Sequence, residues 1–373
     1  MDITFTVGRD VLEKAVSRII TVCERSSVEG RNTLPYFFHI RIDGYGEALK
    51  LSAGNAIRNI EILLPEVSKH EPFCFGVFGS YFHNILKALP SGDLTFTLRD
   101  VCFMHNGSST LKFQILPPDQ FPSENLREDH VWWEVDYREL FSRMRKIIYC
   151  TDSQGVINKS YVKSVHVSPQ YFLCTDNRRL SMTPNDMIPY EKNFLVPAES
   201  IQSFSSLFDL TASRGFVFTD GESRMHFSQG HIHASTRLLV YDAPNFDRAI
   251  PKGSCTSCAV DRESILMSTK RALVVAKKGQ SKDKLQPVSL AFSTNKLRMF
   301  LENQGFGITE NLDITYLGPD MEVHMDLTLL YQAIKSITDD VIKIEMRGDT
   351  TPFVITDNNR EHINVIMPVL VRR

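Results

Sequence analysis

The chain has 373 residues, of which 42% are hydrophobic and 23% are charged, and its formal net charge is -2. This length suggests two or three domains, and this composition is typical of a globular protein. The near-neutral charge excludes a protein that is basic overall, so any binding of nucleic acid requires a locally basic surface.

The predicted elements of the first third begin with a strand and a helix, "VGRDVLEKAVSRII" from Val7. Period-two strands follow in "ALKLSAGNAIRNIEILLP", then a helix in "GSYFHNILKAL" from Gly79, with Ser80 at its start. Further strands follow in "LTFTLRDVCFMH" and "STLKFQILP". The second third repeats this order, with helices in "VDYRELFSRMRKII" from Val135 and "PAESIQSFSSLF" from Pro197.

Between these two helices lies "YFLCTDNRRLSM", in which Asp-Asn turn chemistry predicts a hairpin with Arg178 and Arg179 at its rim. The last third has helices in "VDRESILMSTKRALVV" from Val260 and "DLTLLYQAIKSI" from Asp326, and strands such as "PVSLAFSTNKLRMFLE". Pro197 and Asp326 both suit helix starts.

The starts Val7, Val135 and Val260 lie 128 and 125 residues apart, close to one third of the chain. A period this long is typical of duplicated domains, not of a short-repeat solenoid. The pattern predicts an α+β fold of three tandem units, each with two helices and about eight strands, over residues 1–126, 127–251 and 252–373. The alternative is three unrelated α+β domains.

Motifs for chemistry are missing from the sequence. It has no glycine-rich dinucleotide or phosphate loop and no nucleophile elbow. "CTSC" at Cys255–Cys258 has the spacing of half a zinc site but no second pair, and His231 and His233 could complete it only by coincidence of folding. We therefore expect no metal, no cofactor and no catalysis.

The cellular compartment is predicted from the cysteines and from hydropathy. Seven cysteines, an odd number scattered in apolar runs, favour reduced thiols. The first residues lack the layout of a signal peptide, and no apolar run approaches the ~18 residues of a membrane span. We expect a cytoplasmic protein.

Positive charge is concentrated on the predicted helices. Residues 9–23, 80–89, 136–150, 197–208, 261–278 and 326–337 together carry +6, so the remaining residues carry -8. This distribution favours a basic helical surface that faces a polyanion. The alternative is ordinary solvated helix faces, and the fourth helix, whose only charged residue is Glu199, counts against a uniformly basic surface. The candidate phosphate contacts are Lys14, Arg18, Arg138, Arg145, Lys146, Lys270, Arg271 and Lys277.

Six segments, in order along the chain, resemble the bacterial DNA polymerase III β subunit family, the sliding clamps. They are "RNTLPYFFHIRI", "FQILPPDQFPS", "TDNRRL", "PNFDRAIP", "LDITYLGPDMEVHMDLTLLYQAI" and "VIMPVLVRR". The resemblance implies three DNA-clamp domains in a crescent-shaped chain that closes head to tail with a second copy. The homodimeric ring encircles duplex DNA with its helices and acts as a processivity factor in DNA replication.

The resemblance also assigns residues to this ring. It adds Arg31 to the DNA-facing set, and contact with DNA would be independent of sequence. The dimer interface would join Leu111 and Phe113 of one chain to Leu273, Val274 and Val275 of the other. These five apolar residues could instead be core residues.

The resemblance further implies a hydrophobic pocket for short peptides between the second and third units. Its implied partners are the DNA polymerase III α subunit, the clamp loader and other proteins with a clamp-binding motif. Apolar residues would form its floor, and arginine stems would cover its rim. The pocket residues would be Ile157, Thr175, Asn177, Arg178, Arg179, Leu180, Pro244, Arg248, Ala249, Pro352, Val365, Met367, Pro368, Val369 and Leu370.

The chain departs from the family pattern at the pocket. Asn177 replaces a glycine and Arg178 a histidine, and Arg372 and Arg373 extend the end of the chain. Gly155-Val156 stands where the family often has a tyrosine pair, which puts a DNA contact there in doubt. These departures leave open a divergent clamp paralogue, or a non-ring accessory subunit, with a changed set of partners.

Overall fold

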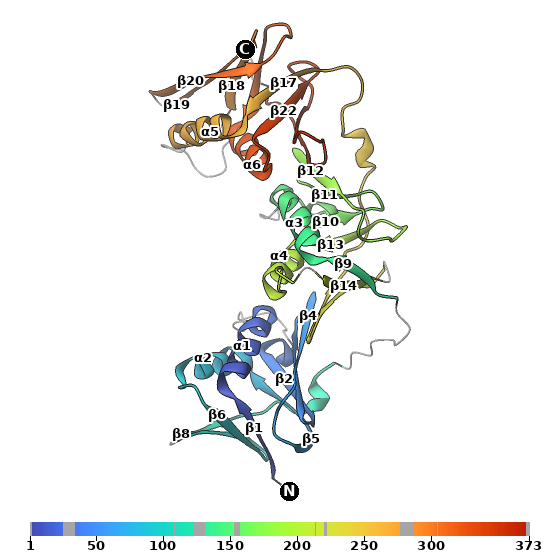
Figure 1. The fold of residues 1–373 in the computed structure, drawn as a ribbon, viewed down its shortest axis with the longest axis vertical. Coiled ribbons are helices and arrows are strands. Elements are labelled where there is room, and N and C mark those ends of the chain that lie inside the picture. Colours follow the sequence, from blue (N-terminus) through green and yellow to red (C-terminus); the bar gives the residue numbers. More distant parts are fainter. Residues whose placement is uncertain are drawn as a thin grey trace. The chain divides into compact units, whose positions relative to one another are not determined.

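The structure is a computed structural model of the chain (Figure 1). It describes residues 2–24, 34–107, 109–122, 131–152, 157–212, 214–219, 222–276, 287–303 and 305–370. Two compact units are distinguished within it. Unit 1 comprises residues 1–138 and 199–238, and unit 2 comprises residues 139–198 and 239–373.

The order of elements repeats three times along the described chain: one strand, one helix, four strands, a second helix and three strands. The first repeat contains β1 (Ile3–Gly8), α1 (Arg9–Ile19), β2 (His39–Gly46), β3 (Ala48–Gly54), β4 (Arg58–Leu64), β5 (His70–Phe78), α2 (Gly79–Ala88), β6 (Asp93–Leu98), β7 (Cys102–Asn106) and β8 (Ser109–Phe113). The second contains β9 (Trp133–Asp136), α3 (Tyr137–Ile147), β10 (Ser164–Val167), β11 (Tyr171–Thr175), β12 (Arg179–Pro184), β13 (Phe194–Pro197), α4 (Ala198–Leu207), β14 (Arg214–Thr219), β15 (Arg224–Gln229) and β16 (Ile232–Arg237).

The third repeat contains β17 (Thr256–Asp261), α5 (Arg262–Ala276), β18 (Pro287–Ser293), β19 (Lys296–Asn303), β20 (Phe306–Thr315), β21 (Met321–Asp326), α6 (Leu327–Ser336), β22 (Val341–Met346), β23 (Phe353–Thr356) and β24 (Ile363–Ile366). Short 3-10 helices, among them η2 (Pro35–Phe38), η4 (Ile148–Cys150), η5 (Tyr161–Lys163) and η6 (Phe246–Arg248), lie between these elements. The predicted α+β repeats, each with two helices and eight strands, are confirmed. The boundaries after residues 126 and 251 stay predictions.

The helix starts follow from local chemistry, with two corrections. Pro197 is the last residue of β13, and α4 begins one residue later, at Ala198. Asp326 caps α6, because its Oδ1 accepts hydrogen bonds from the backbone N–H groups of Thr328 (2.9 Å) and Leu329 (3.3 Å). Ser80, in contrast, is not a cap: α2 already begins at Gly79. A Cβ on Gly79 would lie 2.9 Å from Ile20 Cδ1, so close packing favours glycine at this first position.

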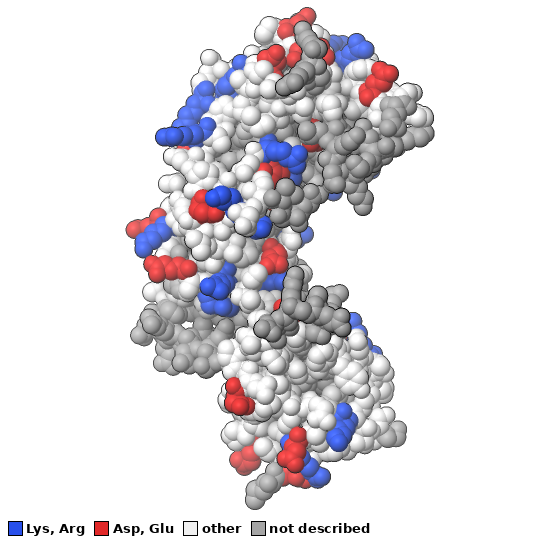
Figure 2. All heavy atoms as spheres, turned by 180° about the vertical axis from the view of Figure 1, so that it is seen from behind, with Lys and Arg blue, Asp and Glu red and all other residues white. Residues whose placement is uncertain are grey.

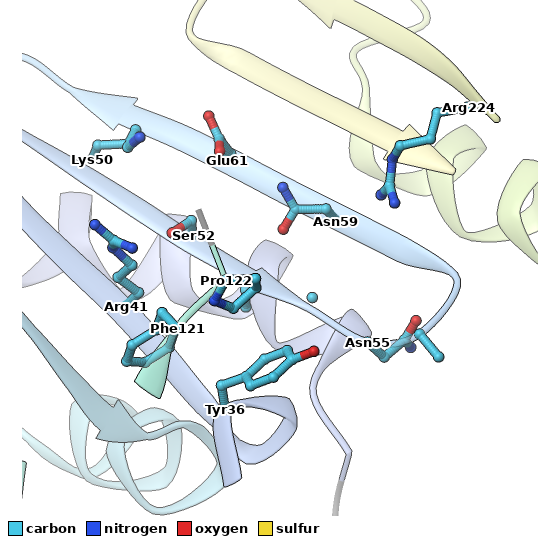
Figure 3. A pocket seen from close by; sticks show the side chains of 13 residues that line it. Tyr36, Arg41, Lys50, Ser52, Asn55, Asn59, Glu61, Phe121, Pro122 and Arg224 are labelled. Atoms are coloured by element: carbon cyan, nitrogen blue, oxygen red, sulfur yellow. The ribbon is translucent and has the colours of Figure 1, made fainter. Parts of the chain in front are cut away.

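Unit 1 contains a four-stranded antiparallel sheet, in the order β1-β6-β7-β8, and an eight-stranded one, in the order β5-β2-β3-β4-β16-β15-β14-β9. Helices α1 and α2 pack against each other in this unit (Figure 1). The larger sheet joins two repeats through antiparallel pairing of β4 with β16, which we call the first junction. Beside it lies a cavity of about 410 Å³ (Figure 3).

Unit 2 contains one twelve-stranded sheet, in the order β13-β10-β11-β12-β24-β23-β22-β17-β20-β19-β18-β21. It joins the second and third repeats through antiparallel pairing of β12 with β24, which we call the second junction. Helices α5 and α6 pack against each other, and Ile265, Leu330 and Ile334 from them are buried in the core. The two junctions therefore use corresponding strands of the repeat.

The surface is mixed in charge on the face shown in Figure 2, where Lys and Arg side chains are interspersed with Asp and Glu. No helix in the described part of the chain is long and apolar enough to cross a membrane. Within the same residues, no group of three or more His, Cys, Asp or Glu side chains is arranged to hold a metal ion.

Candidate functional site

The hairpin predicted around Arg178 and Arg179 is confirmed: β11 pairs with β12 in antiparallel register. Asp176 closes its turn, since Oδ1 accepts hydrogen bonds from the backbone N–H groups of Arg178 (3.0 Å) and Arg179 (3.1 Å). Asn177 has a φ of 70°, in the left-handed region. Asparagine tolerates this region better than most residues other than glycine, so it can take the place of the glycine that the family pattern has here.

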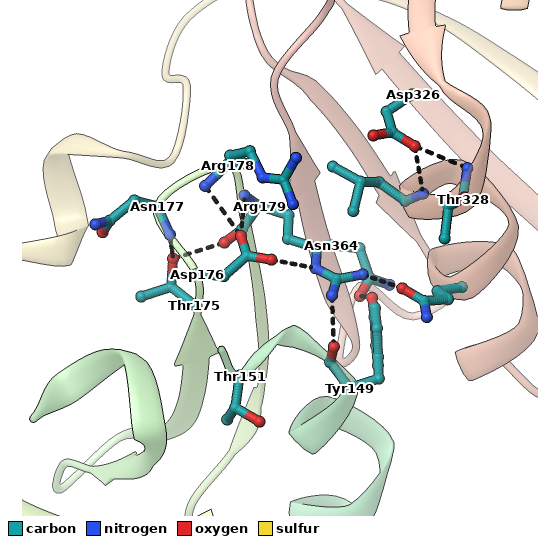
Figure 4. A network of polar contacts seen from close by, with 12 residues as sticks. Tyr149, Thr151, Thr175, Asp176, Asn177, Arg178, Arg179, Asp326, Thr328 and Asn364 are labelled. Carbon is teal, nitrogen blue, oxygen red and sulfur yellow. Dashed lines mark hydrogen bonds and ion pairs between the residues drawn. The ribbon is translucent and has the colours of Figure 1, made fainter. Parts of the chain in front are cut away.

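The two neighbouring arginines lie in different environments. Arg178 is exposed, whereas the side chain of Arg179 is only 9% exposed. Arg179 donates from Nε to Asp176 Oδ2 (2.9 Å), from Nη2 to the Tyr149 carbonyl (2.7 Å) and from Nη1 to Gln332 Oε1 of α6 (Figure 4). Its guanidinium also lies over the Tyr149 ring, 5.1 Å from the centroid. Arg179 therefore links the second repeat to the third and does not present a free charge at the rim.

A second polar network crosses the same junction. Asn364 Oδ1, on β24, accepts hydrogen bonds from the Tyr149 hydroxyl and the Ser181 hydroxyl, both at 2.6 Å. Ser181 Oγ also lies 3.0 Å from His362 Nε2. Burial is the largest cause that lowers the pKa of His362 to about 4, and Lys146 adds to it. His362 is thus neutral at pH 7 and can serve as a hydrogen-bonding partner in the core.

Two of the residues predicted for the pocket, Leu180 and Val365, belong to a buried apolar cluster at the second junction. Leu180 and Val365 are paired across β12 and β24, and each is 4% exposed. The junction cluster consists of Leu173, Leu180, Phe246, Val354 and Val365. Sequence analysis did not select Phe246 or Val354, although an aromatic residue in the segment after β16 was a possible signal for an anchor.

The remaining predicted pocket residues differ in backbone contacts and in exposure. Met367 continues from β24, and its backbone N–H donates to the Arg178 carbonyl (3.1 Å). Val369 donates in the same way to the His324 carbonyl (2.7 Å). Thr175 is buried; the half-buried residues are Ile157, Pro352, Pro368 and Val369, and the exposed ones are Asn177, Arg178, Pro244, Arg248, Ala249, Met367 and Leu370.

The predicted DNA-facing residues differ in how far their charge is available. Arg271 forms an ion pair with Glu310 (2.6 Å), and Arg138 donates to the carbonyls of Leu210 and Thr211 at 3.3 and 3.4 Å. Arg31 and Lys277 lie outside the described residues. Lys14, Arg145 and Lys270 are exposed, and Arg18 and Lys146 are half-buried.

The predicted interface residues lie at or near strands with an unpaired edge. Among the described strands, β8 pairs only with β7, and residues 306–313 of β20 pair only with β19. Leu111 is half-buried and Phe113 buried on β8, while Val274 of α5 is 71% exposed. Leu273 and Val275 pack partly against the core of the third repeat.

Comparison with known proteins identifies the family. The model of the DNA polymerase III beta subunit N-terminal domain matches residues 3–126, and that of its C-terminal domain matches residues 247–370. The chain belongs to the DNA polymerase III beta subunit family. Members of this family are processivity factors of DNA polymerase with no catalysis of their own, and this is the role of the chain.

Individual relatives extend over nearly the whole chain. The beta sliding clamp of Halalkalibacterium halodurans is 23% identical, and that of Bacillus subtilis is 20% identical; each match covers 98% of the chain and 99% of the relative. The beta sliding clamp of C. crescentus has a TM-score of 0.89 at 19% identity and full coverage of both chains. The beta subunit of Streptococcus pyogenes has a TM-score of 0.88 at 21% identity, with 99% and 100% coverage. The predicted clamp fold is confirmed.

Proposed function

We propose that this clamp chain closes head to tail with a second copy into a ring around duplex DNA. The observation that supports this proposal is the order of strands in the sheets. Strands β4, β12 and β20 occupy the same place in their repeats, as do β8, β16 and β24. β4 pairs with β16, and β12 pairs with β24. Among the described strands, one edge of β20 and one edge of β8 are then left without a partner strand. Pairing of β20 with β8 of a second copy would form a third junction of the same kind and cover both edges.

The apolar side chains near these edges support this assembly. Val274 of α5 is largely exposed, so its apolar side chain is available for contact with a second copy. Leu111, which is half-buried, would face it from β8 of the partner, whereas Phe113 is buried in the core of its own repeat. Glu310 lies on the β20 edge, where its ion pair with Arg271 lowers the pKa of its carboxyl.

The dimer is tested by placing charges at the proposed interface. Val274→Glu combined with Val275→Glu should produce monomers at micromolar concentration, because two carboxylates would be buried without partners. Analytical ultracentrifugation over a dilution series measures the mass. Val240→Glu, at a valine that is 81% exposed on the segment after β16, is the control and should remain dimeric. A double variant that stays dimeric contradicts the interface.

Within the ring, the helices would contact phosphates without reading sequence. Exposed Lys14, Arg145 and Lys270, with Arg18 and Lys146, would supply the charge, which is modest in a chain of net charge -2. Retention would therefore depend on topology more than on affinity. After loading by a clamp loader, the protein should stay on closed circular DNA and be lost once the circle is cut. Tight binding to short linear duplex at physiological salt would contradict this mechanism.

The second junction would receive short peptides from the DNA polymerase III α subunit, the clamp loader and other clamp-binding proteins. Met367 is 46% exposed and Leu370 74% exposed next to the buried pair Leu180 and Val365, so apolar surface is available to an apolar anchor. Burial of one leucine or phenylalanine contributes about 1.5–3 kcal/mol. Because ordering the peptide offsets much of this, we expect micromolar affinity.

Fluorescence polarisation with a polymerase-derived peptide tests the pocket. Deletion of residues 369–373 should abolish binding, and Met367→Ala should weaken it more than Arg178→Ala, because a charge at the rim contributes little. Met267→Ala, at a methionine of α5 that is 38% exposed, is the matched control. Unchanged binding by the truncated chain would place the peptide site elsewhere.

A further inference from the structure

A cavity in unit 2, which we call the aromatic cavity, shares a wall with the junction cluster. Its volume is about 390 Å³, within the range of roughly 300–1,000 Å³ found for ligand pockets. Phe246 belongs both to the lining of this cavity and to the junction cluster, and Tyr171 and Ala243 line the cavity and pack against the cluster. A peptide whose apolar side chain occupies the second junction would therefore have this cavity beside it.

Aromatic rings form one part of the cavity wall. The ring centroid of the buried His166 lies 5.9 Å from that of Tyr171 and 5.5 Å from that of Tyr241. The Tyr241 hydroxyl lies 3.2 Å from His166 Nε2 and accepts a hydrogen bond from Asn193 Nδ2 (3.2 Å), which fixes its position. Because burial lowers the pKa of His166 to about 4, this ring is neutral at pH 7 and would not repel a cation.

Asp247 is the one charged side chain among the described residues that line the cavity. It is exposed, and its carboxylate has no ion pair or hydrogen bond within the described part of the chain. Its backbone N–H donates to Asn245 Oδ1 (2.9 Å), which holds the segment in place. Burial is the largest cause that raises the pKa of Tyr171, and Asp247 and Tyr241 raise it further, so these three side chains lie close together. An unpaired carboxylate beside aromatic rings favours an organic cation.

We propose that the aromatic cavity binds the guanidinium of an arginine that neighbours the apolar anchor in a partner peptide. The Asp247 carboxylate would accept charge-assisted hydrogen bonds from this guanidinium. The rings of Tyr171 and Tyr241 would contact its planar face. This inference rests on the peptide pocket proposed at the second junction, and it names a second side chain that the same peptide would carry.

An arginine side chain fits this cavity better than a metal ion does. Calcium and magnesium require several oxygen ligands, usually with more than one carboxylate, and Asp247 supplies the one carboxylate of the described lining. A guanidinium is more weakly hydrated than an ammonium group and stacks on aromatic faces. The combination of rings with a single carboxylate therefore selects arginine.

The first junction lacks this combination. The register of the strands matches His166 with Arg41 and Tyr171 with Lys50. Both replacements are cationic, so a guanidinium would lose aromatic contacts there and meet positive charge instead. The proposed preference for arginine therefore belongs to unit 2.

The cavity is tested by itself with arginine amide and with citrulline amide, its neutral counterpart, in NMR titrations of the full chain labelled at histidine. We expect the His166 ring signal to shift saturably with arginine amide, with a Kd on the order of 10⁻³ M, and citrulline amide to bind at least tenfold more weakly. Asp247→Asn should remove this difference. Asp320→Asn, at an exposed aspartate outside the cavity, should preserve it. The absence of a saturable shift, or the same preference for arginine amide in Asp247→Asn, would overturn the proposal.

Fluorescence polarisation tests whether the cavity serves the peptide. A polymerase-derived peptide is extended at its N-terminus, or at its C-terminus, by Gly-Arg or by Gly-citrulline. One of the two arginine extensions should bind at least fivefold more tightly than its citrulline match, and Asp247→Asn should abolish this gain. Equal binding of arginine and citrulline peptides at both ends would overturn the link between cavity and peptide. Failure of the unextended peptide to bind would contradict the peptide pocket instead, while the NMR titration still decides whether the cavity binds a guanidinium.

Discussion

Asn59 and Ser235 at the first junction occupy the positions that Leu180 and Val365 occupy at the second. The backbone pairing is the same, yet one junction has a polar cavity and the other a buried apolar cluster. Strand pairing therefore determines where a depression can form between repeats, and a few outward-facing side chains determine what fills it. In a chain of duplicated domains, the side chains at one junction can therefore change while the strand pairing at both junctions stays the same.

The arginines that begin the two corresponding strands, Arg179 of β12 and Arg58 of β4, give the largest expected contrast. Arg179→Met should destabilise unit 2 by about 3–5 kcal/mol, because it leaves Asp176 buried without its ion-pair partner. Arg58→Met should cost less than about 1 kcal/mol, because the one ion pair of Arg58 among the described residues is a 3.8 Å contact with the exposed Glu199. Urea unfolding followed by hydrogen exchange in each unit measures both. Equal costs would contradict the assignment of Arg179 as a buried link.

Substitution of the two corresponding residues, Leu180 and Asn59, tests the apolar cluster itself. Leu180→Asn should cost about 3 kcal/mol and abolish binding of polymerase-derived peptides, because it places an amide without partners among apolar side chains. Asn59→Leu, at the corresponding position, should cost less than Leu180→Asn, since Asn59 is only half-buried and leucine places no polar group in the core. Thermal unfolding and fluorescence polarisation check the pair. A Leu180→Asn variant that retains both stability and peptide binding would show that the cluster is not needed.

Acidification should weaken the second junction more than the first. Burial lowers the pKa of His166 and of His362 to about 4, below the usual 6.5, so only the unfolded chain binds a proton between these values. Stability is complete above about pH 6.5 and is lost as pH falls toward 4; between pH 7 and 5, each histidine should cost about 2 kcal/mol. At the first junction, Arg41 takes the place of His166 and stays charged. Burial also lowers the pKa of His233 there, so we expect a smaller fall.

Hydrogen exchange of β10–β12 and of β2–β4 across this pH range measures the difference. His362→Gln should flatten the pH dependence of β10–β12 while leaving that of β2–β4 unchanged. The same pH dependence in both regions, with and without the substitution, would exclude these histidines as its source.

The smallest expected effect concerns the turn. Asn177→Ala should cost about 1 kcal/mol, because alanine is disfavoured at a φ of 70°, whereas Asn177→Gly should be nearly neutral. Asn55 lies in the corresponding turn of the first junction, and its φ is not positive. Asn55→Gly should therefore destabilise, because it removes the side chain that accepts from Ile57 and Arg58. Thermal unfolding of these three variants gives the comparison.

The sequence by itself determined the triple repeat, the six helices and the hairpin of Arg178 and Arg179. These features depend on residues close together in the chain: apolar positions at helical or strand spacing, Asp326 as a cap, and Asp176 and Asn177 as turn residues. Local chemistry also misplaced the start of α2 by one residue. Ser80 has the chemistry of a cap, but close packing against Ile20 favours the glycine before it as the first helical residue.

Only the tertiary structure decided how far each predicted site residue is exposed. Arg178 and Arg179 are alike in sequence, but Arg179 bonds to Gln332, 153 residues away, and its side chain is only 9% exposed, while Arg178 remains in solvent. The polar cavity at the first junction was likewise not predicted, because Arg41, Lys50 and Arg224 meet only when β4 pairs with β16. Burial and charge pairing depend on contacts between residues far apart in the chain, and local patterns carry no information about those contacts.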